Sequence, residues 1–407
     1  MSKGLPSYAE VAAIVAERAE LARVAPVAER VSLSEARGRV LAAPVRADHN
    51  MPPFPRSTRD GYAVRAAEAN RNSELRVAGS TRAGQMPVTD PLAAGAAWEI
   101  MTGAAVPAGA DAVAMLEHVV HGDGAIRLAE PRRLEAGENI VPEGAEAREG
   151  HEIVCAGVRI GAQHIAAAAS CGYAEVEVFR RPKVVILTTG DELVPVTAKP
   201  GPGQIRNSNA PMLASLVEQF GGQALAMPAV PDTAEALDKA LYVTAAADMV
   251  IFSGGVSAGR FDLVEPALER LGARFHFTGA RIQPGKPVVF GELPRGDMSQ
   301  PFFGLPGNPI SSAATFLLFA APVLAALAGR GDTLPRFALA RLERGVKGKQ
   351  GLTRFVPAYC EAGGEVGPVG TQGSGDIAAF ARANCFLMVP EGEAGLAAGE
   401  MVSILIF

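Results

Sequence analysis

The feature that most constrains the fold is an alternation of apolar strands and helices between Lys183 and Gly291. The sequence predicts strands at Lys183–Leu187, Gln223–Pro228, Met249–Phe252 and Pro287–Gly291, with helices at Ala210–Phe220, Thr233–Ala246 and Asp262–Leu271 between them. Continuous apolar runs such as Met249–Phe252 are typical of parallel strands buried on both faces. The alternation therefore predicts an α/β domain, in which helices cover both faces of a parallel sheet.

The segments around this α/β domain follow other patterns. Ser7 and Glu10 have the spacing of a capping box ahead of an amphipathic helix. Between Asp60 and Ile140, short apolar runs alternate with Gly, Pro and Asp turns, which indicates a small β-domain. The tail from Leu334 to Phe407 is again β-like. A chain of 407 residues should hold two to four such domains, with hinges expected near Pro182 and Gly329.

Composition excludes several classes of protein. The formal net charge of −5 contains no basic block, so nothing resembles the footprint of a nucleic-acid binder. The four cysteines form no CxxC pair and the N-terminus has no signal-peptide core, so we expect a reducing, cytoplasmic location. One segment, Ile310–Ala328, is almost wholly apolar, but it contains Ser311, Ser312 and Thr315 and has no basic residues before it. We expect a buried helix there and not a membrane span.

Three polar loops follow apolar segments of the α/β region. TTGDEL begins at Thr188, SGGVSAG begins at Ser253, and FGLPGNPISS leads into a helix expected to start at Pro309 with Asn308 as its N-cap. Glycine turns and helix N-termini present free backbone N–H groups, which favour phosphate or similar oxyanions. The carboxylates of Asp191, Glu192 and Asp262 would repel such an anion unless a divalent cation such as Mg²⁺ lay between them. Lys286 could add a fixed positive charge.

Each loop taken alone is also explained by ordinary turn and cap chemistry. The pair His118 and His121 is a weak metal candidate, because residues three apart on a strand point to opposite faces. A side-chain nucleophile is poorly supported, since no Ser or Cys lies in a G-x-S-x-G elbow. The polar residues suit phosphoryl or phosphoanhydride chemistry, in which positioning and charge neutralisation matter most.

Eight motifs in a fixed order resemble the molybdopterin molybdotransferase family, which includes the bacterial MoeA proteins and the E domain of gephyrin. They are PPFPRSTRDGYAVR (52–65), MTGAAVPAGADAVAMLEH (101–118), LTTGDEL (187–193), GQIRNSN (203–209), SGGVSAGRFD (253–262), QPGKP (283–287), GLPGNPIS (304–311) and QGSGDIAAFARAN (372–384). Their combined order and spacing carry the resemblance, since any single motif would be weak.

The resemblance implies an elongated, multidomain α+β and α/β chain of four domains that forms a homodimer. Its parts would be an N-terminal helical or linker domain (1–45 and 142–180), an inserted β-domain (46–141), a molybdopterin-binding α/β domain (181–329) and a C-terminal β-domain (330–407). The implied enzyme takes adenylylated molybdopterin and molybdate, hydrolyses the pyrophosphate link with Mg²⁺ and releases molybdenum cofactor and AMP. Its implied partners are the molybdopterin adenylyltransferase and the apo-molybdoenzymes or their chaperones, without nucleic acid or membrane.

The resemblance also implies roles for particular residues. The catalytic set is Asp60, Thr102, Asp191, Glu192 and Asp262, with Asp60 and Thr102 reaching into the cleft of the other subunit. The implied metal ligands are Asp191, Glu192 and Asp262. The substrate-binding set is Ser253, Gly254, Gly255, Ser257, Gly259, Asn207, Pro306, Gly307 and Asn308. Molybdate would contact Lys286, Ser311 and Arg354.

Three positions depart from the family pattern. Gln283 stands where the family commonly has the first lysine of KPGKP, Leu352 where it has an arginine, and Glu146 where an aspartate is usual. Our hypothesis is that Arg354 partly replaces the lost arginine and that molybdate binds more weakly than in the family. The departures keep an alternative open, a divergent paralogue that binds molybdopterin-type ligands as a carrier without inserting metal. The choice between molybdate and tungstate is also open.

Overall fold

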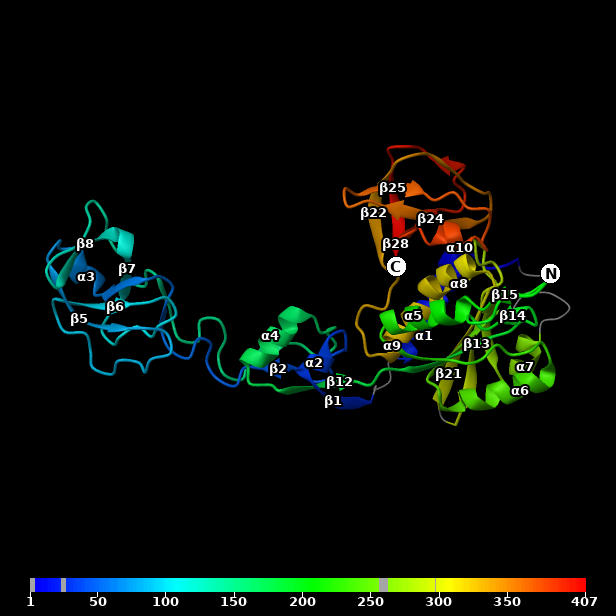
Figure 1. Cartoon of the computed structure of the whole chain (residues 1–407), viewed down its shortest axis with the longest axis horizontal. Helices are drawn as coiled ribbons and strands as arrows, with labels where there is room; N and C mark the ends of the chain where they lie inside the picture. Colours follow the sequence, from blue (N-terminus) through cyan, green and yellow to red (C-terminus); the bar gives the residue numbers. More distant parts are fainter. Residues whose placement is uncertain (1–3, 23–26, 256–262, 297) are drawn as a thin grey trace.

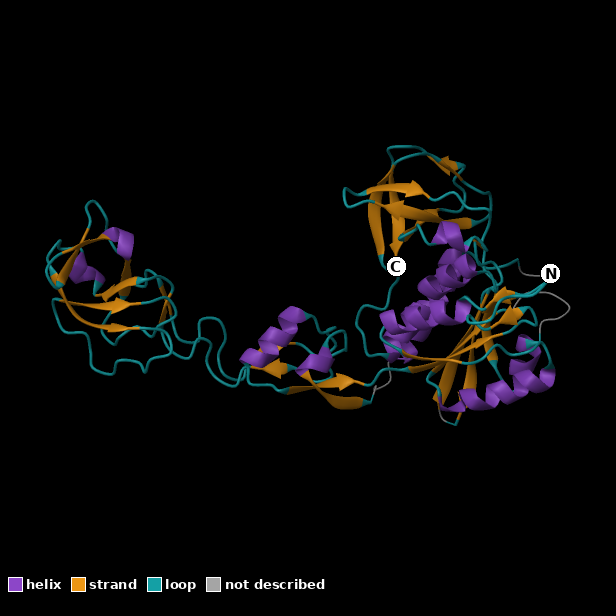
Figure 2. Cartoon of the chain, in the orientation of Figure 1, coloured by secondary structure: helices purple, strands orange, loops and turns teal. Residues whose placement is uncertain are grey.

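The computed structural model describes residues 4–22, 27–255, 263–296 and 298–407. The chain is elongated (Figure 1), with a β-domain at one end, a small N-terminal domain in the middle, and the α/β and C-terminal domains together at the other end. The layers expected from the sequence are present, with helices on a sheet in the α/β domain and mainly strands in the two β-domains (Figure 2).

The α/β domain is built on a six-stranded sheet of order β16-β13-β17-β21-β20-β18. Its strands are β13 (Lys183–Thr188), β16 (Gln223–Ala226), β17 (Met249–Ser253), β18 (Arg274–Thr278), β20 (Val289–Arg295) and β21 (Met298–Leu305). The first four in that order are mutually parallel; β16, β13 and β17 were predicted, and β21 was not. The predicted strand at Pro287–Gly291 corresponds to β20, but β20 runs antiparallel to both of its neighbours, so the sheet is mixed.

Two layers of helices cover this sheet. One face packs against α5 (Asn209–Gln219) and the run α8 (Pro309–Thr315), η3 (Phe316–Ala320) and α9 (Ala321–Leu327). The other face packs against α6 (Ala234–Val243) and α7 (Val264–Arg270), with the short η2 (Thr244–Ala246) after α6. Side chains alternate between the two cores along β13, since Val184 and Ile186 face one layer and Val185 and Leu187 the other. Burial on both faces explains the continuous apolar runs of these strands.

Helix α1 (Tyr8–Ala22) begins with the predicted capping box, in which the Ser7 N–H and hydroxyl both donate to Glu10 Oε2 and the Glu10 N–H donates to Ser7 Oγ. Its buried residues Val11, Val15 and Ala19 belong to the core of the α/β domain, and α1 packs along α9. The helix therefore does not pack with the rest of the N-terminal unit (1–45 and 142–180) to which the sequence assigned it. Its apolar stripe is buried by a helix almost 300 residues further along the chain, which local periodicity cannot indicate.

The apolar segment near Ile310 forms one continuous helix, Pro309–Leu327, of 19 residues with a mean hydropathy of 2.0. Its length and composition would suit a membrane span, but 94% of its most apolar window is buried inside the protein. The central turn, η3, has π-helical geometry just before Pro322, a residue that has no N–H to donate to the helix. The helix is a core element of the α/β domain, as expected.

The N-terminal domain has its own small core. Strand β1 (Ala28–Ser32) pairs antiparallel with β12 (Glu175–Phe179), and β2 (Val45–Arg46) pairs with β11 (Glu152–Val154). Helices α2 (Leu33–Ala36) and α4 (Ala162–Ser170) pack on these strands. The short strands β3 (Arg56–Ser57) and β10 (Ile140–Val141) pair where the chain enters and leaves the β-domain.

The β-domain contains a six-stranded sheet of order β7-β4-β6-β5-β9-β8. Its elements are β4 (Gly61–Val64), α3 (Ala66–Ala69), β5 (Leu75–Thr81), β6 (Ala96–Ile100), β7 (Ala112–Met115), η1 (Leu116–His118), β8 (Val119–His121) and β9 (Ala125–Leu128). At Gly61 the neighbouring strand comes so close that a Cβ would lie 1.9 Å from the Ala114 carbonyl oxygen. Glycine is thus required at the position directly after Asp60.

The C-terminal domain is built on a third six-stranded sheet, of order β19-β24-β25-β22-β28-β26. Its elements are β22 (Phe337–Leu342), β23 (Val346–Lys347), β24 (Thr353–Cys360), β25 (Glu365–Pro368), α10 (Ile377–Phe380), β26 (Cys385–Val389), β27 (Gly395–Leu396) and β28 (Met401–Ile406). Strand β19 (Ile282–Gln283) comes from the α/β part of the chain and joins this sheet by pairing with β24. The two domains therefore share a sheet edge.

Candidate active site

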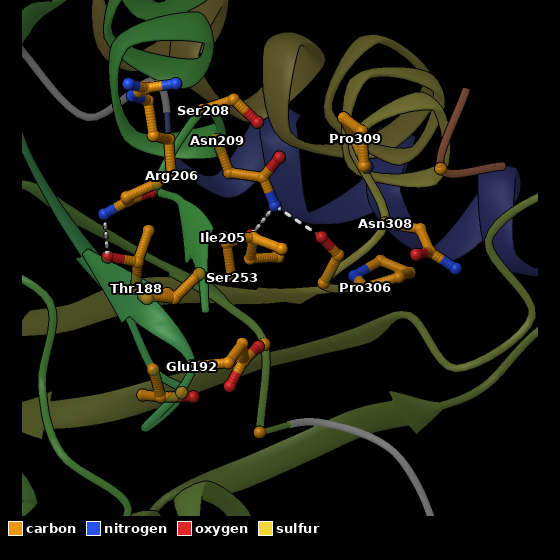
Figure 3. A pocket seen from close by; sticks show the side chains of 18 of the residues that line it. Thr188, Glu192, Ile205, Arg206, Ser208, Asn209, Ser253, Pro306, Asn308 and Pro309 are labelled. Atoms are coloured by element: carbon orange, nitrogen blue, oxygen red, sulfur yellow. Dashed lines mark hydrogen bonds between the residues drawn. The ribbon is translucent and has the colours of Figure 1, made fainter. Parts of the chain in front are cut away.

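A cleft with a volume of about 720 Å³ lies at the carboxyl ends of β13, β17 and β21. All three polar loops predicted from the sequence line it, through Thr189, Gly254 and Asn308 among others. Residues of the short strands β14 (Leu193–Val194) and β15 (Ile205–Arg206) complete one wall. Figure 3 shows side chains that line the cleft, with Ile205 and Arg206 of β15 among those labelled. The site is where an open α/β sheet ordinarily binds its ligand.

Backbone geometry at the end of β17 depends on two glycines. Gly254 and Gly255 have φ angles of +90° and +63°, in the left-handed region that other residues avoid. A Cβ would lie 2.6 Å from the Thr189 carbonyl oxygen at Gly254 and 2.7 Å from Thr189 Oγ1 at Gly255. The two loops after β13 and β17 therefore touch through backbone, and any larger residue would push them apart.

Two asparagines of the GQIRNSN segment fix the floor of the cleft. Asn209 donates from Nδ2 to Ser253 Oγ at 2.9 Å and to the Gly307 carbonyl oxygen at 2.7 Å, as the dashed lines in Figure 3 show. Asn207 donates from Nδ2 to Thr188 Oγ1 at 2.7 Å. Both asparagines are buried. They join helix α5 to the ends of three strands, and Asn207, Ser253 and Gly307 are brought together as predicted.

Acidic residues line the other side of the cleft. Glu192 and Asp232 both line it, and the Asp232 N–H donates to Asp191 Oδ1 at 3.1 Å. The Glu192 carboxylate lies over Gly190, where a Cβ would be 2.5 Å from Glu192 Oε2. Burial raises the pKa of Asp232 above its ordinary value, and the negative charges of Asp191 and Glu192 raise this pKa further. These three carboxylates therefore repel one another in the absence of a cation.

Asp232 is a site residue that sequence reasoning missed. It follows β16, whose parallel neighbour β13 leads into Asp191 and Glu192, so both loops emerge at the same edge of the sheet. The signal was present, because the segment after the predicted strand Gln223–Pro228 contains an acidic residue at a sheet edge where two others were already expected.

The acidic edge fits a cation by its charge. Carboxylate oxygens are the ligands that Mg²⁺ prefers, and the charges of Asp191 and Glu192 add to the increase in the pKa of Asp232 that its burial causes. Within the described residues, no group of three or more His, Cys, Asp or Glu side chains has the arrangement of a metal site. His118 lies in η1 and His121 in β8, and neither belongs to such a group.

The C-terminal domain closes one end of the cleft. Asn308 donates from Nδ2 to Ser374 Oγ at 2.9 Å, and the Ile310 N–H donates to the Ser374 carbonyl oxygen at 3.1 Å. Gly375 and Ile377 line the cleft next to them. Asn308 is the N-cap residue of α8, as predicted, but its side chain makes no cap hydrogen bond with the helix. The QGSGD segment of the C-terminal domain is thus part of the site, a role its sequence alone did not reveal.

The three residues expected at molybdate lie beside the cleft, and none of them lines it. Lys286 is exposed and directly precedes Pro287, which does line the cleft, whereas Ser311 is buried in α8. Arg354 is paired with Gln283 across β24 and β19, and its Nη1 donates to the Lys347 carbonyl oxygen. The guanidinium is therefore held by the C-terminal domain itself.

Asp60 and Thr102 lie together in the β-domain, at the opposite end of the chain from the cleft (Figure 1). Within one chain the structure therefore does not bring them to Glu192 or Ser253. Both side chains are exposed at the end of the sheet next to Gly61. Ser257, Gly259 and Asp262, the other predicted site residues of the SGGVSAGRFD segment, lie outside the described residues.

Three family models match consecutive parts of the chain. Residues 7–172 match the MoeA N-terminal region (domain I and II), residues 185–326 a probable molybdopterin binding domain, and residues 339–407 the MoeA C-terminal region (domain IV). Together they cover most of the sequence. The cleft described above lies mainly within the second match, with Gly375 and Ile377 contributed by the third.

Curated relatives and solved structures agree with these matches. The chain is 35% identical over 384 residues to a molybdopterin molybdenumtransferase of Haemophilus influenzae, covering 92% of this chain and 93% of the relative. It is 34% identical over 400 residues to the enzyme of that name from Bacillus subtilis, covering 93% and 89%. A crystal structure of a molybdopterin biosynthesis moeA protein from Pyrococcus horikoshii OT3 superposes with a TM-score of 0.82 at 27% identity, covering 99% of this chain and 100% of the other.

Proposed function

The chain belongs to the MoeA family, and we propose that it is a molybdopterin molybdenumtransferase that acts in the biosynthesis of the molybdenum cofactor. The observation that carries this proposal is the composition of the cleft. Glycine loops and a polar floor suited to oxyanions face an acidic edge suited to a cation. A substrate with a pyrophosphate group, bound together with a divalent cation, fits both sides at once.

We propose adenylylated molybdopterin and molybdate as the substrates, and molybdenum cofactor and AMP as the products. The loop that begins at Gly254 would bind phosphate oxygens through backbone N–H groups such as that of Gly255. The Gly254 N–H is not one of them, since it donates to the Leu305 carbonyl oxygen at 3.1 Å. Asn209 holds Ser253 and Gly307 in fixed positions before a ligand arrives. Lys286, beside Pro287, would attract the molybdate anion from the rim.

Glu192, Asp232 and Asp191 would hold Mg²⁺, with Asp262 as the further ligand expected from the sequence. When bound, Mg²⁺ would offset the charge of the pyrophosphate and polarise its phosphorus–oxygen bonds. The hydrogen bond from the Asp232 N–H to Asp191 Oδ1 holds these two residues next to each other. Burial is the main cause of the raised pKa of Asp232, and the charges of Asp191 and Glu192 add to it; a divalent cation would offset this second contribution.

A homodimer is the assembly that gives Asp60 and Thr102 a role in the reaction. They lie too far along the chain to reach the cleft of the same subunit, as Figure 1 makes clear. In a two-fold symmetric, antiparallel pairing, the β-domain of each subunit would cover the cleft of the other and bring the Asp60 carboxylate to it. We further propose a cytoplasmic location, supported by four cysteines that are all free, and exchange with a molybdopterin adenylyltransferase and with apo-molybdoenzymes or their chaperones.

Incubation of the protein with adenylylated molybdopterin, Mg²⁺ and molybdate, followed by measurement of AMP, tests the proposal. We expect AMP release that requires both Mg²⁺ and molybdate. Absence of AMP at every molybdate concentration would exclude the transferase and favour the carrier alternative, for which Gln283 and Leu352 are the supporting observations. A carrier would still bind the adenylylated pterin, so a binding measurement on the same sample separates the carrier from an inactive preparation.

A further inference from the structure

We propose that Gly329 and Phe179 are positioning residues for the reaction, because their contact sets the direction in which residues 28–179 project from the α/β domain. This segment, called the arm below, comprises the N-terminal domain and the β-domain (Figure 1), and Asp60 and Thr102 belong to its β-domain. The inference rests on the proposed function, in which these two residues act at the cleft of another subunit.

The contact between the two residues leaves no room for a side chain. Gly329 ends helix α9 with a φ of +74°, and the next N–H, that of Arg330, donates back to the Ala325 carbonyl oxygen at 2.9 Å. A Cβ at Gly329 would lie 2.2 Å from Phe179 Cδ2 and 2.6 Å from Phe179 Cε2. The phenyl ring at the end of β12 therefore rests directly on the backbone at the end of the central helix.

Phe179 is itself fixed within the arm. Its N–H donates to the Val40 carbonyl oxygen at 2.8 Å, and its carbonyl oxygen accepts a hydrogen bond of 2.9 Å from Arg39 Nη2. Arg39 is only 9% exposed and also pairs with Glu29 of β1. Because the ring is tied to the core of the N-terminal domain, a displacement of Phe179 must turn that domain with it.

The chain directly after Phe179 is fixed to the α/β domain. Arg180 donates to both carboxylate oxygens of Asp248, each at 2.9 Å, and the Lys183 N–H donates to Asp248 Oδ2 at 2.6 Å. Bidentate pairs of this kind restrict orientation as well as distance. Asp248 lies directly before β17, the strand that leads into Ser253, so the arm is attached to the base of the strand whose other end forms the cleft.

A second point of attachment lies beside the first. Arg159 of the arm donates from Nη2 to the Gln219 carbonyl oxygen at the end of α5, and from Nε to the Gly38 carbonyl oxygen, both at 3.4 Å. The arm thus meets the α/β domain at the ends of α5 and α9 and at the start of β17. These neighbouring contacts with three elements restrain the orientation of the arm more than the linker near Pro182 would by itself.

The length of the arm makes this orientation important for catalysis. The β-domain lies at the far end of the molecule from the junction, so a small rotation at Phe179 moves Asp60 through a much larger distance (Figure 1). Misplacement of a reacting group by about 1 Å can cost roughly a hundred-fold in rate. Gly329 therefore acts on the reaction through Asp60 while lying in neither the β-domain nor the cleft.

The test compares Gly329→Ala with Gly331→Ala, a matched control in the same segment. A Cβ at Gly331 meets nothing within 4 Å, and its φ is not in the left-handed region. Phe179→Leu is the second variant, since it keeps an apolar residue at the end of β12 but removes the ring from Gly329. For each variant we would measure AMP release at saturating substrate, the Kd for AMP, the small-angle X-ray scattering profile and the thermal unfolding midpoint.

We expect Gly329→Ala to lower the turnover number roughly ten- to a hundred-fold, to leave the Kd for AMP within about two-fold, and to change the scattering profile. Gly331→Ala should match the wild type in all three. Phe179→Leu combined with Gly329→Ala should recover part of the turnover. If Gly329→Ala folds and turns over like the wild type, the inference is wrong; it is equally wrong if turnover and AMP binding fall together. A wild type that releases no AMP would contradict the proposed function instead, while the scattering comparison would still decide whether the contact sets the arm.

Discussion

Asp60 accepts two hydrogen bonds from Thr102 through one carboxylate oxygen, at 2.6 Å from the Thr102 backbone nitrogen and at 2.8 Å from its hydroxyl. Both residues are exposed in the β-domain, and among the described residues no basic side chain forms an ion pair with Asp60. The two hydrogen bonds hold the pKa of Asp60 below its ordinary value. An exposed carboxylate that is oriented and kept ionised is suited to act on a ligand outside its own domain.

Asp60→Asn should lower AMP release about a hundred-fold or more without unfolding the protein, because the amide oxygen can still accept both hydrogen bonds from Thr102. Thr102→Ser retains the donors and serves as the control. Since the folded pKa of Asp60 is lowered, its ionised form stabilises the fold above the ordinary aspartate pKa, and this contribution is lost as the pH falls through the folded value. The difference in unfolding midpoint between wild type and Asp60→Asn should therefore shrink in acid. Full activity of Asp60→Asn would exclude a role for its charge.

Mixing two inactive variants should restore activity if the site is shared between subunits. Asp60→Asn disables the arm and Glu192→Gln disables the cleft, so a mixed dimer contains one intact pair of Asp60 and Glu192. Random exchange of equal amounts should recover about a quarter of the wild-type turnover. The two variants kept apart provide the baseline. No recovery, although mass spectrometry shows that mixed dimers have formed, would place both residues in the same subunit's site or in none.

Asp232→Asn should stabilise the metal-free protein at neutral pH. The folded pKa of Asp232 is raised above its ordinary value of 3.8, so the protonated form is favoured by the fold, and this stability is lost as the pH rises through the folded value. The variant stays neutral and should unfold at a higher temperature than the wild type near pH 7, with no difference below pH 3.8. Mg²⁺ should raise the midpoint of the wild type more than that of the variant. A variant that gains as much from Mg²⁺ as the wild type would remove Asp232 from the cation site.

Gly254→Ala should abolish turnover and cost about 1–2 kcal/mol of unfolding free energy from the positive φ alone. The clash with the Thr189 carbonyl oxygen should add to this cost and displace the loop after β13. Gly203→Ala is the matched control, because Gly203 has a φ of +75° but nothing within 4 Å of its Cβ position. Chemical denaturation and AMP release measure the two effects. If Gly254→Ala and Gly203→Ala lose the same unfolding free energy, the loops after β13 and β17 can move apart without an energetic cost.

Gln283→Lys should lower the molybdate concentration needed for half-maximal turnover several-fold, because it returns a cation to the segment beside Pro287. Gln163→Lys adds the same charge in the N-terminal domain and should have no effect.

Arg354→Ala should lower molybdate-dependent turnover more than it lowers the affinity for AMP. Equal effects of Arg354→Ala on both would indicate that its hydrogen bond to the Lys347 carbonyl oxygen is purely structural.

The sequence predicted the α/β domain well where strands are continuous and apolar. Met249–Phe252 and Lys183–Leu187 lie within β17 and β13 almost residue for residue. Strand β21 was missed because its segment, MSQPFFGL, contains proline and glycine at positions that ordinarily indicate turns. It is nevertheless a central strand, with Phe302 and Phe303 buried on opposite faces of the sheet. Tertiary burial overrode the local pattern there.

The site could be predicted only as far as strand ends could be recognised. The loops after β13 and β17 and the turn at Asn308 were found because each follows an apolar run, and the cleft contains all three. Asp232 was missed because it follows the exposed edge strand β16, and Ser374 because it comes from another domain. Neither the distance between Asp60 and the cleft nor the contact of Phe179 with Gly329 has a signature in local sequence. Both depend on how the domains are joined.

The core helix Pro309–Leu327 also has a consequence for how the protein is made. While unfolded, this segment would be long, exposed and strongly apolar, and it would be as prone to aggregate as a membrane span in water. Helices α1 and α5 and the strands of the α/β sheet that pack against it precede it in the chain, so they have left the ribosome before it emerges. Among the described buried residues of the same core, only Phe355, Phe386 and Leu405 of the C-terminal domain follow it. The order of elements thus lets an apolar surface form first, on which this aggregation-prone segment of the nascent chain can pack as it emerges.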